Sequence, residues 1–151
     1  MSFQVSSPFK TEILAHRLGD DLGAGDCLLL SGAIGAGKSH FARALIQSRL
    51  PRPEDIPSPT FTLVQIYDLE FTELWHCDLY RLSDPFEVIE LGLLEAFETA
   101  VCLIEWPDRL QDLSPPGALH LEIVADTQNM SERTIKFAWQ DSRWDKRMAA
   151  L

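Results

Sequence analysis

The sequence predicts a three-layer α/β domain that spans residues 1–151 and contains a mostly parallel central sheet. The first observation is the segment Gly-Ala-Ile-Gly-Ala-Gly-Lys-Ser at 32–39, which matches the phosphate-binding pattern G-x-x-x-x-G-K-[ST] at every fixed position. The second observation is a pair of continuous apolar runs, 27–30 and 101–104, which are typical of buried parallel strands. Together they predict a P-loop fold in which strand 27–30 leads into the phosphate-binding loop.

Hydrophobic spacing and turn residues predict the elements around this loop. Residues 8–22 carry an apolar stripe at helical spacing, and the glycines of segment 20–25 predict the end of that helix. Residues 40–50 continue the loop as a helix, which Pro51 stops. The proline-rich segment 51–59 is expected to be a connector, because proline fits neither a helix interior nor a central strand.

The middle of the chain predicts two further strands and a helical segment. β-branched and aromatic residues over 60–67 indicate one strand, and residues 74–78 indicate another. Asp84, followed by proline, predicts a helix start, and the helix would run to about Phe97. Gly92 is expected to weaken or divide that helix, since glycine disfavours a helix interior.

The C-terminal part predicts an antiparallel addition to the sheet. Residues 119–124 and 134–138 alternate apolar and polar side chains, with a polar stretch between them. This pattern is typical of a hairpin with one solvent-facing side. The tail 139–151 is short and amphipathic, which is compatible with a helix.

The loop carries the predicted chemistry. Its glycines allow backbone angles that turn successive N–H groups toward an anion, and the following helix adds its positive dipole end. Lys38 would reach the β- and γ-phosphates of a nucleotide, and the Ser39 hydroxyl would ligate Mg²⁺. The residues expected to contact the nucleotide here are Gly32, Ile34, Gly35, Ala36, Gly37, Lys38, Ser39 and His40.

A P-loop site also needs an acid that holds the metal ion, and two positions compete for this role. Glu105 ends the strongest apolar run, and Asp78 ends strand 74–78, directly after residues 75–77. Each could instead be a surface residue at a strand end, or both could act, one on the metal and one on water or phosphate. Thr60, after a rigid proline, is either a nucleotide-sensing switch residue or an ordinary strand start.

Two other polar residues near these strands are less informative. His76 is interpreted as a half-buried strand histidine rather than a ligand. By spacing alone Arg133 in the hairpin is a surface charge, although it could reach the nucleotide.

Composition bounds the partners and the compartment. The net charge of −10 disfavours direct binding of nucleic acid, so a role in a nucleic-acid pathway would run through a protein partner. No apolar run approaches the roughly 20 residues that span a bilayer, so we expect no membrane association. Three widely spaced cysteines in apolar runs indicate buried free thiols, and we therefore expect a reducing, cytoplasmic location.

Several short sequence motifs, taken together, resemble those of the bacterial TsaE family, also called YjeE. These are small P-loop ATPases required for the threonylcarbamoyladenosine modification of transfer RNA. The matching words occur in family order and spacing, and they are GAIGAGKS at 32–39, SPTFTLV at 58–64, HCDLYRL at 76–82, ELG at 90–92 and IEWP at 104–107. The combination is far more specific than the phosphate loop alone.

The resemblance implies roles for individual residues. Asp78 matches an aspartate that the family needs for function, Glu105 a glutamate associated with Mg²⁺, and Thr60 the switch-like threonine. Trp106 matches the neighbouring tryptophan, and Arg133 falls at a hairpin position near the nucleotide. Residues 7–11 would lie near the adenine. Ala33 and His40 depart from the family pattern, in which an acid and a second threonine are usual at these positions.

The resemblance therefore predicts a weak ATPase with ATP or ADP and Mg²⁺ as cofactors. It would dock on the synthase subunits TsaD and TsaB and reset that complex, with at most weak direct contact to tRNA. Three alternatives remain open, and they are a small-molecule kinase, a GTPase switch and a nucleotide-bound scaffold in which hydrolysis is incidental. The low Lys and Arg total of 13 disfavours a kinase with an arginine-bearing lid, and no Asn-Lys-x-Asp word is present for reading guanine.

Overall fold

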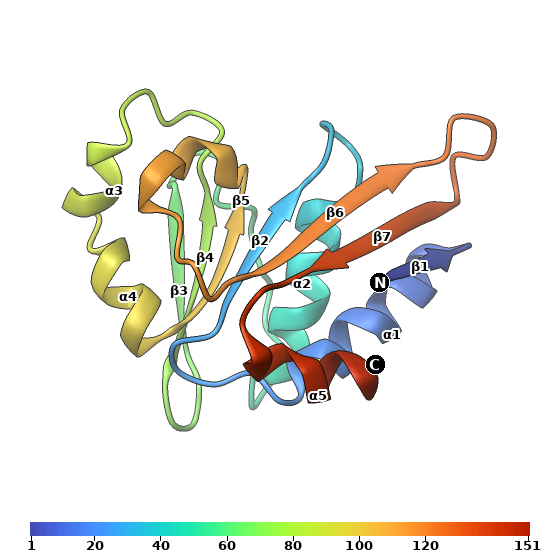
Figure 1. Cartoon of the computed structure of the whole chain (residues 1–151), viewed down its shortest axis with the longest axis horizontal. Coiled ribbons are helices and arrows are strands. Elements are labelled where there is room, and N and C mark those ends of the chain that lie inside the picture. The colour runs from blue at the N-terminus through green and yellow to red at the C-terminus, as the bar shows by residue number, and fades with distance from the viewer.

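The computed structural model describes all residues 1–151 and contains one seven-stranded sheet with the strand order β1-β7-β6-β2-β5-β4-β3 (Figure 1). The strands are β1 (Ser2–Val5), β2 (Cys27–Ser31), β3 (Val64–Asp68), β4 (Glu73–Asp78), β5 (Val101–Glu105), β6 (Leu119–Ala125) and β7 (Arg133–Ala138). The α-helices are α1 (Pro8–Gly19), α2 (Lys38–Arg49), α3 (Phe86–Glu90), α4 (Leu93–Thr99) and α5 (Asp145–Ala149). Two 3₁₀ segments complete the chain, and they are η1 (Pro107–Leu113) and η2 (Ser142–Trp144).

The central strands of the sheet are parallel and its edges are antiparallel. β2 pairs in parallel with both β5 and β6, and β4 pairs in parallel with β5. The hairpin β6–β7 is antiparallel, as predicted, and carries β1 antiparallel on its outer edge. β3 adds a second antiparallel edge beside β4. The predicted α/β P-loop architecture is confirmed, with a mixed sheet in which antiparallel pairing extends beyond the C-terminal hairpin.

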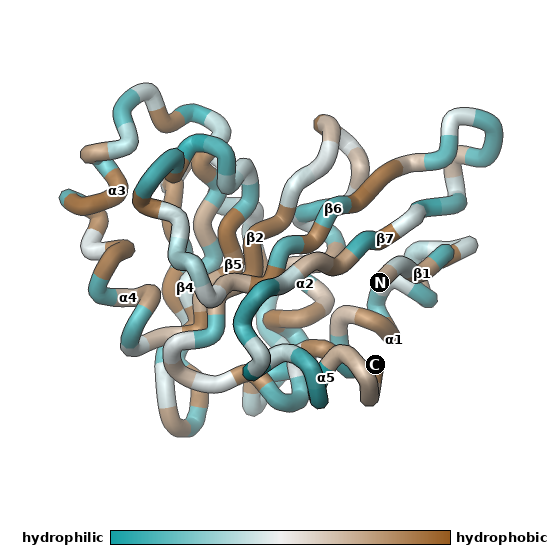
Figure 2. Tube along the Cα trace, viewed as in Figure 1, coloured by the Kyte–Doolittle hydropathy of each residue, from teal (hydrophilic) through white to brown (hydrophobic).

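Helices cover both faces of the sheet, which gives three layers (Figure 1). The side chains of β2 alternate between the two resulting cores, with Leu28 and Leu30 in the core shared with α1, α2 and α5. Cys27 and Leu29 lie in the core on the opposite face, with α3, α4 and η1. Because both faces are buried, the strand is apolar at every core position, and Figure 2 shows this hydrophobic character along the interior strands.

The first helix ends earlier than predicted and without a glycine cap. α1 stops at Gly19, and the following residue, Asp20, keeps right-handed helical angles. The guanidinium of Arg49, at the end of α2, donates hydrogen bonds to the carbonyls of Gly19 and Leu22. These carbonyls are thus satisfied by a side chain, which removes the need for a glycine C-cap. Of the two glycines in segment 20–25, only Gly25 has a positive φ, and it lies six residues beyond the end of α1.

The predicted strand over 60–67 begins four residues late. Leu63 has a φ of 64°, and its N–H donates to the carbonyl of Pro59, so residues 59–63 form a compact turn. The strand starts only at Val64. The division at Gly92 is confirmed, because its φ of 81° separates α3 from α4. The edge strand β1 was missed, since four residues give too little periodicity to identify a strand.

The cysteines and the C-terminal tail agree with the expectations from the sequence. The three cysteines, Cys27, Cys77 and Cys102, are free and buried. The C-terminal tail forms η2 and α5, and it is anchored by Trp144, whose side chain is fully buried. None of the helices has both the length and the apolar character required to cross a membrane.

Candidate functional site

A cavity of about 420 Å³ lies over the phosphate-binding loop, where the parallel strands β2, β4 and β5 end. The loop, the first turns of α2 and the residues at these strand ends line it. The lining residues are Ile34, Gly35, Gly37, Lys38, Ser39, His40, Arg43, Thr60, Asp78, Tyr80, Glu105 and Trp106. Ligands of open α/β sheets bind at this edge, outside the carboxyl ends of the strands.

Three glycines of the loop have a positive φ, and Gly32 and Gly37 show what this does for its backbone path. Gly32 has a φ of 144°, and a Cβ added there would lie 2.4 Å from the carbonyl oxygen of Ile123 in β6. Gly37 has a φ of 116° and is the N-cap of α2, which begins at Lys38. The loop therefore runs close to the sheet and ends at the positive end of a helix dipole. A helix N-terminus of this kind is suited to hold a phosphate.

The Lys38 side chain is folded over the loop. It is only 5% exposed, and its Nζ donates to the carbonyls of Gly32 at 2.8 Å and Ala33 at 2.9 Å. The ammonium also lies 4.3 Å from the ring centroid of Trp106, close enough for a cation–π interaction. Burial lowers the pKa of Lys38, and the Glu105 carboxylate opposes that shift. The lysine is thus held over the phosphate-binding loop by two of the loop's own carbonyls and by the ring of Trp106.

Ser39 and Glu105 meet across the end of the sheet. The Ser39 hydroxyl donates to Oε1 of Glu105 at 2.8 Å, and Glu105 itself is 1% exposed. The second carboxylate oxygen, Oε2, lies 2.8 Å from Nε2 of His76, which is fully buried. The expectation that His76 is half-buried is therefore wrong, whereas its position in a strand is confirmed. Because β4 and β5 are adjacent and parallel, the histidine reaches the carboxylate between the sheet and α2.

Thr60 and Asp78 form a second polar pair beside the first. The Thr60 hydroxyl lies 3.2 Å from Oδ2 of Asp78 and 2.8 Å from the Ser58 hydroxyl. The other oxygen, Oδ1, accepts the backbone N–H of Tyr80 at 3.0 Å. Asp78 and Glu105 are direct partners in the β4–β5 register, so the two competing acids stand side by side at the strand ends.

Arg133 joins the hairpin to the loop rather than extending into solvent. Its Nε donates to the carbonyl of Ala36 at 2.8 Å, and its Nη1 donates to the carbonyl of Glu132 at 2.9 Å. A Cβ added at Gly37 would lie 4.0 Å from this Nε. The guanidinium is therefore tied to the phosphate-binding loop, whereas the spacing alone predicted a surface charge.

Two predicted nucleotide contacts lie at the rim of the cavity. Ile34 is 75% exposed at the tip of the loop. His40 lines the cavity, but its Nε2 lies 3.3 Å from the carbonyl of Pro8 and 3.5 Å from a carboxylate oxygen of Glu12. This contact brings the start of α1, the segment expected near the adenine, against the start of α2.

Two lining residues were not among the sequence candidates. Arg43 lies one turn after Ser39 on α2, so helical spacing could have placed it on the same side. The ring of Tyr80 packs 4.8 Å from that of Trp106, measured between centroids. Trp106 adopts a φ of 59°, a left-handed conformation that is rare for a bulky residue, immediately after Glu105. A strained backbone at this point aims the indole over Lys38.

The polar groups suit a hard cation. The chain has no group of three His, Cys, Asp or Glu side chains that could hold a metal ion without other ligands. Ser39, Glu105 and Asp78 offer only oxygen donors to the cavity. Mg²⁺ is typically held by one or two carboxylates, with phosphate and water oxygens completing the shell. The donor set therefore fits Mg²⁺ bound together with a phosphate-bearing ligand.

Three features of the site define the class of the protein. A strand leads into the phosphate-binding loop, a buried lysine and a serine stand at the start of the following helix, and acids lie at two neighbouring strand ends. It is a P-loop α/β protein of the nucleotide-binding type.

Comparisons with known proteins give the family. The family model described as "Threonylcarbamoyl adenosine biosynthesis protein TsaE" matches residues 5–135. A TsaE protein from Rickettsia conorii is 37% identical over 83% of this chain and 71% of its own length. One from Bacillus subtilis is 32% identical over 96% of this chain and 89% of its own length. The chain belongs to the TsaE family.

A solved structure agrees with this assignment. The crystal structure of YdiB from Bacillus subtilis superimposes with a TM-score of 0.82 and 26% sequence identity. The superposition covers 99% of this chain and 92% of YdiB. The similarity therefore extends over the whole fold, including the edge strand β1 and the C-terminal helix.

Proposed function

We propose that the protein is a Mg²⁺-dependent ATPase that supports threonylcarbamoyladenosine modification of tRNA. In this proposal its ATP cycle resets a complex of the synthase subunits TsaD and TsaB. Membership in the TsaE family supports the pathway. The observation that carries the ATPase part is the pairing of Ser39 with Glu105 beside the Thr60–Asp78 pair, in one cavity with Lys38.

The cavity residues have distinct roles in this proposal. The loop N–H groups and Lys38 would hold the β- and γ-phosphates, and Ser39, Glu105 and Asp78 would hold Mg²⁺. When bound, Mg²⁺ neutralises charge that develops on the phosphate oxygens. Asp78 and Thr60 would orient a water that attacks the γ-phosphorus. The bond from that phosphorus to the β–γ bridging oxygen breaks, which yields ADP and inorganic phosphate.

The charge of the chain supports a protein partner rather than direct tRNA binding. The net charge is −10, and a nucleic-acid surface repels such a protein unless a basic patch offsets it. Several large apolar side chains are exposed, including Phe61 at 80%, which follows the cavity-lining Thr60, and Phe86 at 69% on α3. Aromatic residues are enriched at protein–protein interfaces relative to the rest of a protein surface.

Reconstituted tRNA modification tests the proposal. The assay combines the protein with TsaD, TsaB, ATP and tRNA, and it compares wild type with Lys38→Ala and Asp78→Ala. We expect both variants to lose multi-turnover modification. Lys146→Ala and Asp21→Ala are matched controls, because both residues are exposed and lie outside the cavity.

Three results would contradict the proposal, and two of them would favour a different function. Full multi-turnover activity of both Lys38→Ala and Asp78→Ala would contradict a role for the ATP cycle. A Glu105→Ala protein that still binds nucleotide and supports wild-type modification would instead favour a scaffold. Phosphorylation of an added metabolite far faster than ATP hydrolysis would favour a kinase.

A further inference from the structure

His76 is a buried polar residue beside the cavity that the proposed ATPase mechanism does not use. Its side chain is fully buried, on β4 between Leu74 and Asp78 along the same face of the sheet. Its Nε2 lies 2.8 Å from Oε2 of Glu105. Its other ring nitrogen, Nδ1, is enclosed without any hydrogen-bond partner, so the contact with Glu105 is the only polar interaction of the ring.

The contact gives the two carboxylate oxygens of Glu105 different partners. Oε1 faces Ser39 and the cavity, and Oε2 faces the protein interior, where His76 holds it. A carboxylate oxygen accepts hydrogen bonds, and Nε2 of the histidine donates to it in the tautomer that carries its proton there. Turning both oxygens toward the cavity would break that bond and would leave the buried imidazole without a partner, which is costly.

This division has a consequence for the choice of metal ion. Ca²⁺ prefers six to eight oxygen ligands, commonly with a carboxylate that binds through both oxygens. Mg²⁺ requires a compact octahedron and takes a single oxygen from each carboxylate, with water and phosphate filling the rest. We infer that His76 is a positioning residue that restricts Glu105 to one cavity-facing oxygen and thereby makes the nucleotide site select Mg²⁺ over Ca²⁺. The inference rests on the proposed function, because it concerns the ion that accompanies ATP.

Three substitutions separate this role from simple core filling. Gln places its side-chain nitrogen the same number of bonds from Cα as Nε2 of histidine, so His76→Gln can keep the contact with Glu105. The nitrogen of Asn falls one bond short, so His76→Asn keeps a polar group but loses the contact. His76→Leu fills the space without a donor. A purely structural role predicts equal metal preference in all three variants.

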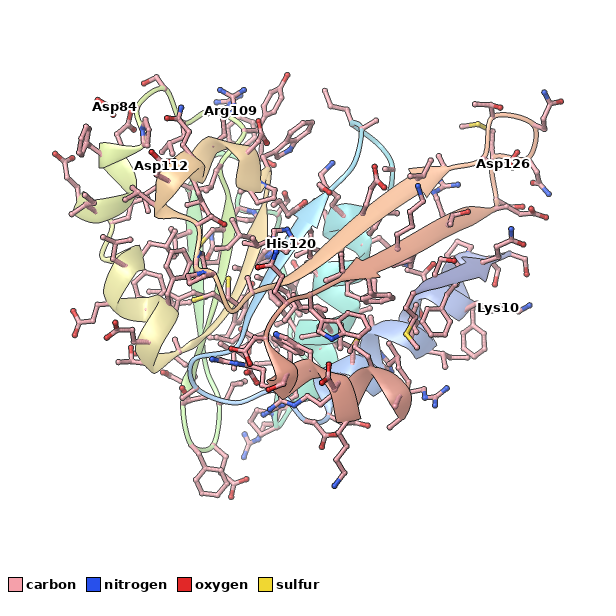
Figure 3. The ribbon with its side chains drawn as sticks, in the orientation of Figure 1. Lys10, Asp84, Arg109, Asp112, His120 and Asp126 are labelled. Atoms are coloured by element: carbon pink, nitrogen blue, oxygen red, sulfur yellow. The ribbon has the colours of Figure 1, made fainter.

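The experiment measures binding of a fluorescent, non-hydrolysable ATP analogue at increasing concentrations of Mg²⁺ or of Ca²⁺. The readout is the ratio of the half-saturating Ca²⁺ concentration to the half-saturating Mg²⁺ concentration. We expect a ratio of about ten or more in wild type and in His76→Gln, since hydrogen bonds to metal ligands commonly change metal affinity 10–100-fold. In His76→Asn and His76→Leu the ratio should fall about tenfold. His120→Gln, at an exposed position of β6 (Figure 3), should match wild type.

The outcomes separate the two proposals. If wild type binds the analogue with Mg²⁺ and the asparagine and leucine variants keep the wild-type ratio, the role of His76 is refuted and the ATPase proposal stands. A wild-type ratio near one also refutes it, and this measurement does not depend on any variant folding. If wild type binds the analogue with neither ion, the proposed function itself fails. Where His76→Leu does not fold, His76→Asn decides by the same ratio.

Discussion

Replacing Gly32 by alanine tests the physical reason for the path of the phosphate-binding loop. At φ 144°, Gly32 has a conformation that is almost restricted to glycine, and strain of this kind costs about 1–3 kcal/mol. The new Cβ would also lie 2.4 Å from the backbone carbonyl oxygen of Ile123, which is too short for any stable contact. Relieving such an overlap costs about another 1–3 kcal/mol. Together they predict a loss of about 2–6 kcal/mol in the free energy of unfolding.

Two other glycines separate these contributions. Gly35 has a φ of 78° but nothing within 4 Å of an added Cβ, so Gly35→Ala carries the conformational cost alone, about 1–2 kcal/mol. Gly23 has neither a positive φ nor a close neighbour. Gly23→Ala should therefore be neutral or stabilise the protein by about 0.4–1 kcal/mol, because alanine restricts the unfolded chain.

Urea unfolding of the three variants and wild type, followed by circular dichroism, gives the required free energies. The comparison is valid where the dependence on urea concentration is the same in all four proteins. We expect the order of stability Gly23→Ala, then Gly35→Ala, then Gly32→Ala. If Gly32→Ala were as stable as Gly35→Ala, the close approach to Ile123 would contribute nothing, and the steric argument would be refuted.

Three further predictions concern the buried core. Burial raises the pKa of Cys102 to about 12, while an unfolded thiol titrates near 8.5. The protein therefore loses stability as pH rises from about 8.5 toward 12, because the thiol ionises in the unfolded chain before it does so in the folded one. In urea titrations at pH 9 and 10, Cys102→Ala should reduce that loss by about 1 kcal/mol per pH unit. Trp144→Phe removes the indole N–H that donates to the carbonyl of Gly117 at 2.9 Å, and it should lower the unfolding free energy by about 1–3 kcal/mol. An unchanged unfolding free energy would contradict this prediction. Asp26→Asn weakens the 2.6 Å contact with Arg147 and should lower the unfolding free energy by about 1–3 kcal/mol. Because Asp26 is buried, adding salt to wild type should not produce the same loss.

Elements with strong local patterns were predicted correctly, and those that depend on distant partners were not. The buried strands β2 and β5 and the hairpin are visible in the order of apolar residues. The end of α1 was misplaced because its carbonyls are satisfied by Arg49, which lies thirty residues away along the chain. The start of β3 was misplaced because Leu63 takes a left-handed conformation, which is not expected of a leucine from its residue type.

The candidate site divides in the same way. Lys38 and Ser39 follow from the pattern of the loop itself, because the spacing of glycines, lysine and serine within one turn is a local property. The role of His76 did not follow, because it depends on the register of β4 against β5. The same register brings Asp78 beside Glu105, and so it leaves both acids, rather than one of them, in reach of the cavity.

By itself, the sequence determined the phosphate-binding loop, its strand and helix, the α/β class and the family resemblance. Each of these depends on patterns of residues that lie close together in the chain. Only the tertiary structure decided how the loop is held. The carbonyl of Ile123 requires glycine at position 32, and the guanidinium of Arg133 binds the loop carbonyl of Ala36 from the hairpin. These contacts join residues about 90 or more positions apart, and only packing of the sheet brings such groups within hydrogen-bonding or van der Waals distance.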